Sequence, residues 1–214
     1  MNRPRIIIAD DHTLMIEGLR RLLESDFEVI GTATNGRELV SLLDLMIPDA
    51  IVLDIAMPEL NGIEAARTIS KSHPDIKLVF VTQQIDRHYL QAAFRAGASA
   101  FVAKQSASTE LQVAIHSALR GEAYITSLPG SGKTILPDMS GIVASDLFDG
   151  GLTPRQRQVL QLTAEGRTVK EIGVSLKISP KTVEFHKSAI MDQLGLRNTA
   201  DLTRYAVSHG IISA

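Results

Sequence analysis

The sequence predicts an α/β fold, a doubly wound (βα)5 parallel sheet, followed by a smaller all-α domain of four helices. Three observations lead to this prediction. Short apolar runs alternate with helical patterns over the first ~120 residues. A stretch rich in Pro, Gly and Ser then loses all periodicity. From Leu152 onward only helical patterns and helix-start signals recur. Strands that alternate regularly with helices are typical of a parallel sheet.

Five apolar runs predict the strands. They are short and do not alternate with polar residues, which is typical of strands buried on both faces of a parallel sheet. The predicted strands are residues 5–9, 27–31, 50–53, 76–81 and 100–103. Because crossover connections are right-handed, the first and third strands are expected to lie together at the centre.

Helices are predicted between the strands. The first carries Leu14, Leu19, Leu22 and Leu23 on one stripe. The second and third begin at Asn35 and Asn61, since Asn is a favoured N-cap residue. A fourth spans residues 86–96, and a fifth runs from a Ser108 cap to Gly121. Residues 1–121 therefore form one predicted domain.

Residues 122–150 are predicted to be a linker. They contain Gly130-Ser131-Gly132-Lys133-Thr134, which resembles part of a phosphate-binding loop. The full motif needs a glycine where Ser127 stands, and no buried strand leads into it. The linker interpretation is therefore favoured.

Residues 151–214 form the second predicted domain. Thr153-Pro154-Arg155-Gln156 and Thr168-Val169-Lys170-Glu171 are capping boxes that begin two helices. Ser179-Pro180 begins a third after only Lys177-Ile178, and so tight a turn predicts a helix-turn-helix. A fourth helix follows Asn198-Thr199.

The third helix of this domain has two distinct faces. Val183, Ile190 and Leu194 fall on one side, and the polar side carries Lys181, Glu184, Phe185, Ser188 and Asp192. We expect this helix, including Thr182, to enter the major groove of double-stranded DNA, with Lys181 and Lys187 on phosphates. Glu184, Phe185 and Ser188 would reach base edges, where Glu accepts from cytosine N4 and Phe contacts a thymine methyl. The alternative is a helical module that docks a protein.

Charge is distributed unevenly between the two domains. Residues 1–150 hold 13 Lys and Arg against 19 Asp and Glu, whereas residues 151–214 hold 9 against 5. A basic second domain agrees with a nucleic-acid partner. The chain has no cysteine, no signal-peptide pattern and no apolar run near the ~20 residues of a membrane span, so we expect a cytoplasmic protein.

Acidic residues follow two of the predicted central strands. Asp10 and Asp11 follow the first, and Asp54 follows the third. Open α/β sheets place their chemistry at this edge, so the three carboxylates are expected to converge. Such oxygen ligands suit Mg²⁺. The alternative for Asp10 or Asp11 is a simple helix cap.

Two independent sets of motifs resemble one family. The first half carries Ala9-Asp10-Asp11-His12, Leu53-Asp54, Met57-Pro58, Asn61-Gly62, Thr82 and Phe101-Val102-Ala103-Lys104. The second half carries Leu152-Thr153-Pro154-Arg155, Lys170-Glu171-Ile172, the run from Ser179 to His186, and Leu194-Gly195. Over nearly its whole length the chain resembles bacterial response regulators of the NarL/FixJ type, a receiver domain followed by a LuxR-type helix-turn-helix.

The resemblance implies a role for each matching residue. Asp54 would be the phosphoryl acceptor, and Asp10, Asp11, Asp54 and the backbone carbonyl of Ala56 would hold Mg²⁺. Lys104 would pair with Asp54 or the phosphoryl oxygens, Thr82 would be the switch hydroxyl, and Phe101 the aromatic that moves with it. Taken singly, Lys104 could be a solvated lysine and Phe101 plain core. Gly173 departs from the family, which usually has Ala there.

The expected function is that of a transcription factor phosphorylated on Asp54 by a sensor histidine kinase. Phosphorylation would change an interdomain contact or promote a homodimer that occupies paired half-sites, with RNA polymerase as a further partner. No independent substrate turnover is expected. One alternative is a small Mg²⁺-dependent phosphohydrolase. Another is a constitutive DNA-binding protein whose first domain only forms dimers.

Overall fold

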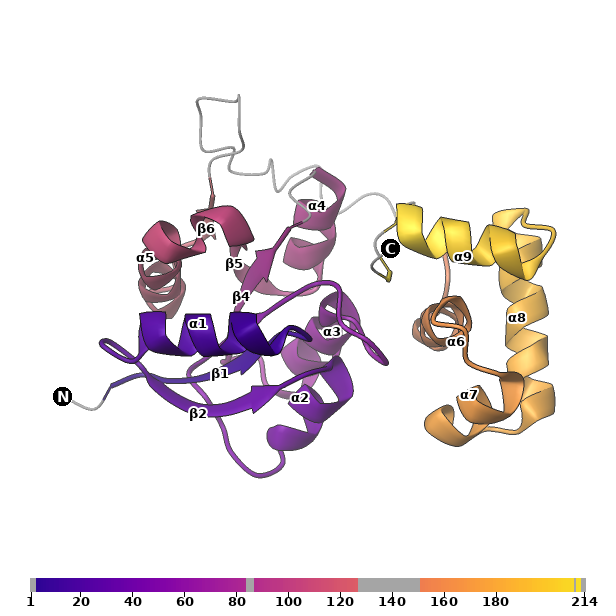
Figure 1. Ribbon diagram of the computed structural model, residues 1–214, viewed down its shortest axis with the longest axis horizontal. Coiled ribbons are helices and arrows are strands. Elements are labelled where there is room, and N and C mark those ends of the chain that lie inside the picture. Colours follow the sequence, from indigo (N-terminus) through magenta and orange to yellow (C-terminus); the bar gives the residue numbers. More distant parts are fainter. Residues whose placement is uncertain (1–2, 84–86, 127–150, 210, 213–214) are drawn as a thin grey trace.

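A computed structural model describes residues 3–83, 87–126, 151–209 and 211–212, and the side chains of residues 87 and 88 are not described. Figure 1 shows a sheet domain, and beside it a group of helices at the C-terminal end. The sheet domain contains β1 (Arg5–Ala9), α1 (Thr13–Leu23), β2 (Glu28–Ala33), α2 (Gly36–Leu42), β3 (Ala50–Leu53), α3 (Gly62–Ser72), β4 (Lys77–Thr82), α4 (Arg87–Arg95), β5 (Ala98–Ala103), a 3-10 turn (Lys104–Ser106), α5 (Ala107–Leu119) and β6 (Tyr124–Ile125).

The sheet is parallel throughout, in the order β2-β1-β3-β4-β5-β6. The first and third strands pair in the interior of the sheet, where Ile8 lies opposite Val52 and Ala9 opposite Leu53. The predicted doubly wound fold is therefore confirmed, and the carboxyl ends of β1 and β3 lie side by side.

Helices cover both faces of this sheet, as Figure 1 shows. Strand residues such as Ile6 and Val52 pack against α1 and α5. Their neighbours in sequence, such as Ile7 and Ile51, point the other way and pack against α2, α3 and α4. Both faces of the central strands are buried, which explains their unbroken apolar sequences.

Three predictions for this domain were wrong. Leu14 was expected on the buried stripe of α1, but it is 90% exposed, and Ile16 takes that place instead. Ser108 does not begin α5, because the 3-10 turn advances the helix start to Ala107. Residues 124–125 were predicted as linker but form β6 beside β5, with Ile125 opposite Phe101. The remaining linker, 127–150, and with it the predicted Gly130–Thr134 motif, lies outside the described residues.

The helical domain contains α6 (Pro154–Ala164), α7 (Val169–Leu176), α8 (Pro180–Leu194) and α9 (Thr199–Ser208). The predicted caps are confirmed, since the side chains of Thr153, Thr168, Ser179 and Asn198 each accept a hydrogen bond from a backbone N–H in the first helical turn. Val183, Ile190 and Leu202 pack in its core. Within the described residues, no helix combines the length and apolar character that a bilayer crossing requires.

Gly173 has a packing reason in the helix-turn-helix. A Cβ on this residue would lie 2.9 Å from the carbonyl oxygen of Ile178, in the turn between α7 and α8. The backbone of Ile178 also donates a hydrogen bond to the carbonyl of Gly173. The turn itself passes through Lys177, which has a left-handed conformation with φ of 54°. Gly173 therefore lets the two helices approach more closely than alanine would.

Candidate functional site: an acidic pocket and an exposed helix

Asp10 and Asp54 lie next to each other because β1 and β3 are paired. Each follows its strand directly, and the Asp54 N–H donates to the carbonyl of Ala9 at 2.9 Å. Both carboxylates are buried, with Asp10 1% and Asp54 4% exposed. Two buried carboxylates repel each other unless a cation or hydrogen-bond donors compensate them.

Lys104 supplies a cation between these carboxylates. It follows β5, and its Nζ lies 2.7 Å from Asp10 Oδ2 and 2.7 Å from Asp54 Oδ2. Burial raises the pKa of the Asp54 carboxyl, and the bond to Lys104 offsets this only in part. Burial alone would lower the pKa of the Lys104 amine, but its two hydrogen bonds to Asp10 and Asp54 outweigh burial, so that its pKa is raised. The lysine is therefore held in its charged form.

Asp11 and His12 complete a group that can hold a metal ion. Ligand atoms of Asp10, Asp11, His12 and Asp54 all lie within 4.8 Å of one another. His12 Nδ1 is 2.8 Å from Asp11 Oδ1 and 3.1 Å from Asp10 Oδ1. The donor set is dominated by carboxylate oxygens, which fits a hard cation such as Mg²⁺.

Thr82 and Phe101 lie on neighbouring strands of the sheet, Thr82 at the end of β4 and Phe101 within β5. Thr82 ends β4 and is fully buried, opposite Ala103 of β5. Phe101 is also buried, and its carbonyl accepts a hydrogen bond of 2.9 Å from the N–H of Thr126, just after β6. The segment that follows α5 is thus joined to the backbone of Phe101.

The loop between β3 and α3, residues 54–61, borders the pocket and includes Ala56. Asn61 caps α3 by accepting from the N–H of Glu64 at 3.0 Å, as predicted. A Cβ on Gly62 would collide with the carbonyl oxygen of Asp54, and one on Gly36 with the carbonyl oxygen of Leu60. Asp54 Oδ1 accepts a hydrogen bond of 2.7 Å from the N–H of Ile55. Glycines thus allow this loop to fold tightly against the end of β3.

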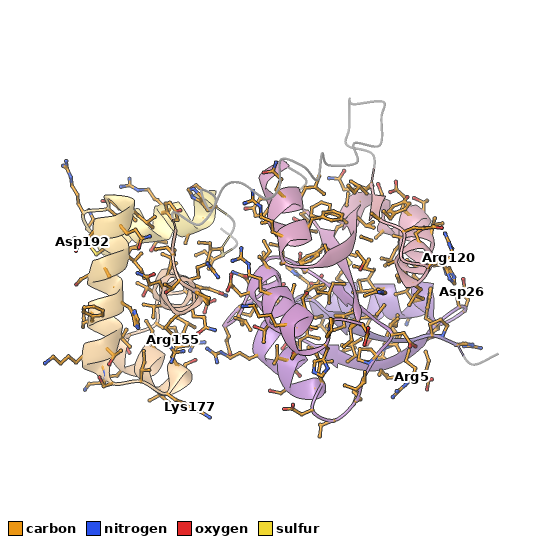
Figure 2. All side chains as sticks on the ribbon, turned by 180° about the vertical axis from the view of Figure 1, so that it is seen from behind. Arg5, Asp26, Arg120, Arg155, Lys177 and Asp192 are labelled. Carbon is orange, nitrogen blue, oxygen red and sulfur yellow. The ribbon has the colours of Figure 1, made fainter. Side chains whose placement is uncertain are left out.

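The second group of predicted residues lies on α8. Lys181, Glu184, Phe185 and Ser188 are exposed, whereas Thr182 and Lys187 are partly buried. Phe185 is 70% exposed, and its ring lies edge-on to that of His186. Figure 1 shows α8 on the side of the helical domain away from the sheet, and Figure 2 shows Asp192 of the same helix at this outer edge. The outward face of α8 is therefore accessible to a large partner.

The sequence did not identify a third group of residues, which joins the two domains. Arg157 Nε lies 2.6 Å from Glu64 Oε1, and Gln161 hydrogen-bonds to the backbone of Met57 and Asn61. The single local signal is a glutamine between Leu160 and Leu162 in an otherwise apolar run. Because their partners lie about a hundred residues away, nothing nearby in the sequence identifies them.

Comparisons with known proteins agree with both halves of this arrangement. Residues 6–116 match the response regulator receiver domain, and residues 151–206 match the LuxR family of bacterial regulatory proteins. The chain is 34% identical to the transcriptional regulatory protein LiaR of Bacillus subtilis, with 98% of this chain and 99% of LiaR covered. It is 31% identical to MctR of Rhizobium johnstonii, with 98% and 95% covered.

Solved structures of RcsB have a similar fold. RcsB of Salmonella enterica serovar Typhimurium, bound to promoter P1flhDC in the presence of the phosphomimetic BeF3-, aligns with a TM-score of 0.64 and 28% identity, covering 97% of this chain and all of that one. Two RcsB dimers bound to two parallel DNAs align with a TM-score of 0.56 and 27% identity, with 97% and 99% covered. This chain belongs to the response regulators that join a receiver domain to a LuxR-type DNA-binding domain.

Proposed function

We propose that this response regulator is phosphorylated on Asp54 by a sensor histidine kinase and thereby controls transcription. The domains would be a receiver over residues 1–121, a linker over 122–150 and a DNA-binding domain over 151–214. The observation that carries the proposal is the buried Asp54 carboxylate at the end of β3, with Lys104 2.7 Å from one of its oxygens.

The chemistry at Asp54 is nucleophilic. One carboxylate oxygen attacks the phosphorus of a phosphohistidine, a P–O bond forms, the P–N bond breaks, and the imidazole leaves with the electron pair. Asp10, Asp11, Asp54 and the carbonyl of Ala56 would hold Mg²⁺, which offsets charge on the transferred group. Lys104 already lies at the carboxylate and would pair with a phosphoryl oxygen.

The response would begin at Thr82 and Phe101. The Thr82 hydroxyl donates to a phosphoryl oxygen, and Phe101 moves with it, so that β5 and the helices around it change shape. The hydrogen bond from Thr126 to the carbonyl of Phe101 favours this route, since it joins the switch to the segment leading into the linker.

DNA recognition would use the exposed face of α8. Lys181 and Lys187 bind phosphates, Thr182 lies beside them, and Glu184, Phe185 and Ser188 read base edges in the major groove. Homodimers formed on phosphorylation would occupy paired half-sites, as the RcsB dimers on DNA suggest by analogy. RNA polymerase is proposed as the partner of the DNA-bound dimer.

The test is phosphate labelling of the full chain by a small phosphodonor in Mg²⁺, combined with footprinting of promoter DNA. Asp54→Asn should abolish the label and lower promoter occupancy. The matched control is Asp44→Asn, an exposed aspartate of the same domain, which should label like the wild type. Normal labelling of the Asp54 variant would place the acceptor elsewhere.

A further inference from the structure

The first helix of the DNA-binding domain contacts the loop that follows the phosphoacceptor. Gln161 of α6 is 1% exposed and forms two hydrogen bonds to this β3–α3 loop. Its Oε1 accepts from the N–H of Asn61 at 3.0 Å, and its Nε2 donates to the carbonyl of Met57 at 3.0 Å. One side chain therefore satisfies two backbone groups of the loop, as a neighbouring strand would.

Glu165 is the C-cap residue of α6, one turn after Gln161, and contacts the same loop. Its Oε1 accepts from the N–H of Glu59 at 3.0 Å and from Gln161 Nε2 at 2.8 Å. Glu59 has φ of 63°, a left-handed conformation that is unfavourable for residues other than glycine. The contact with Glu165 thus helps to hold the loop in a strained conformation.

Arg157 lies one turn before Gln161 and completes the contact. Its Nε is 2.6 Å from Oε1 of Glu64, in the first turn of α3, and both side chains are nearly buried. Arg157, Gln161 and Glu165 are spaced four residues apart, so they form a single stripe along α6. We call these three residues the α6 stripe.

The position of this contact determines what it can regulate. The loop begins at Asp54, includes Ala56, and leads into Gly62 of α3, which packs directly against the carbonyl of Asp54. By contrast, α8 lies on the far side of the helical domain (Figure 1), so the contact leaves its outer face accessible. A contact of this kind acts on the phosphorylation site without covering the DNA-reading surface.

With α6 in contact with this loop, both carboxylate oxygens of Asp54 are bonded to groups of the pocket itself. Asp54 Oδ1 accepts from the N–H of Ile55, and Oδ2 is paired with Lys104, which also holds Asp10. A phosphoryl group on Asp54 has to rearrange these bonds, one of which comes from the backbone of Ile55 at the start of the β3–α3 loop. The α6 stripe bonds to the backbone of Met57, Glu59 and Asn61, further along the same loop.

We propose that the α6 stripe positions the β3–α3 loop in its unphosphorylated geometry, so that undocking of α6 accelerates phosphoryl transfer to Asp54. The inference rests on the proposed function of Asp54. At equilibrium the coupling is reciprocal, so phosphorylation of Asp54 weakens the docking of α6 by the factor by which docking lowers the equilibrium level of phosphorylation. The DNA-binding domain thereby becomes part of the machinery that sets the phosphorylation level.

The test compares phosphorylation rates of full-length variants with acetyl phosphate and Mg²⁺. Gln161→Ala should label on Asp54 about fivefold faster than the wild type, a difference of about 1 kcal/mol in the barrier to transfer. The matched control is Gln158→Ala, a glutamine of the same helix whose Oε1 accepts from Arg155 in its own domain, and it should label at the wild-type rate. Glu165→Ala, at a partly exposed position, should change the rate in the same direction if Gln161→Ala fails to fold.

A second measurement follows the loop itself. Amide hydrogen exchange at Glu59 and Asn61 should be faster in Gln161→Ala, and a phosphomimetic should accelerate it in the wild type. Equal or slower labelling of both stripe variants, with a wild type that labels on Asp54, would overturn this inference alone. A wild type that does not label on Asp54 would overturn the proposed function.

Discussion

The acidic pocket and the outer face of α8 are built in opposite ways. In the pocket, Asp10, Asp54 and Lys104 are buried and bonded to one another at 2.7 Å. On α8, Lys181, Glu184 and Phe185 are exposed. The pocket residues are therefore part of the folded core of their domain. The exposed α8 residues project from the helix surface and contribute little to the packing of theirs.

Because of this difference, substitutions in the pocket and on α8 should have different effects on stability and on binding. Removal of one member of a buried charge group leaves the others uncompensated, which is costly. Substitution of an exposed side chain usually changes stability little. Changes in the pocket should therefore affect folding and chemistry together, and changes on α8 should affect DNA binding alone. The predictions below test this separation, from the largest effect on stability to the smallest.

Lys104→Met should cause the largest loss of stability. The variant leaves the carboxylates of Asp10 and Asp54 buried without their cation, and breaking such a group costs about 3–5 kcal/mol. Added Mg²⁺ should restore part of the loss, because a cation that binds only the folded state stabilises it. Thermal unfolding of the sheet domain with and without Mg²⁺ measures both effects.

The control for this change is Lys71→Met, at an exposed position of α3 in the same domain. Its unfolding should stay close to that of the wild type, and Mg²⁺ should have the same effect as on the wild type. A Lys104 variant as stable as the wild type would mean that the carboxylates do not depend on the lysine.

Gly62→Ala should have the next largest effect. Its Cβ would collide with the carbonyl oxygen of Asp54, so that the loop has to move, and overpacking of this kind costs about 1–3 kcal/mol. Gly18→Ala is the matched control, because a Cβ there meets no atom within 4 Å and α1 gains helix propensity of up to ~1 kcal/mol. Chemical unfolding should therefore show opposite signs for the two substitutions, and equal signs would contradict the packing described for the loop.

Much of the fold could be predicted because its signals are local. Asn35, Asn61 and Thr153 each cap a helix within three residues of their own position. Apolar runs predicted the five longer strands, and the handedness of the crossovers predicted that the first and third lie together. The prediction failed for Leu14 because its helical spacing matches the apolar stripe of α1, yet its side chain at the start of the helix is exposed. It also failed for β6, whose two residues are too short to form a pattern.

The candidate site divides in the same way. Parallel strands bring their ends together, so the proximity of Asp10, Asp11 and Asp54 could be expected from position in the sequence. That Lys104 bonds to Asp10 as well as Asp54 could not, because it depends on how two side chains fill one buried space. The α6 stripe could not be predicted at all, since it depends on how one domain packs against another.

Phe185→Ala should have the smallest effect on stability and still impair function. Phe185 is 70% exposed, so its removal should change the free energy of unfolding by no more than about 0.5 kcal/mol. If its ring contacts a thymine methyl, affinity for a promoter site with that base pair should fall about tenfold, and affinity for a site without it should fall less. Binding titrations on both sites, with a melting curve of the variant, measure these effects.

Lys181→Ala is the informative comparison on the same helix, because a lysine that binds phosphate carries no sequence information. This variant should weaken binding to both sites alike and reduce the slope of affinity against salt concentration by about 1. Should Phe185→Ala also weaken both sites equally, the ring would act as a general contact and Glu184 and Ser188 would remain as the base-reading residues. Should Phe185→Ala instead lower the melting temperature by as much as Gly62→Ala, the separation between a structural pocket and a binding helix would fail.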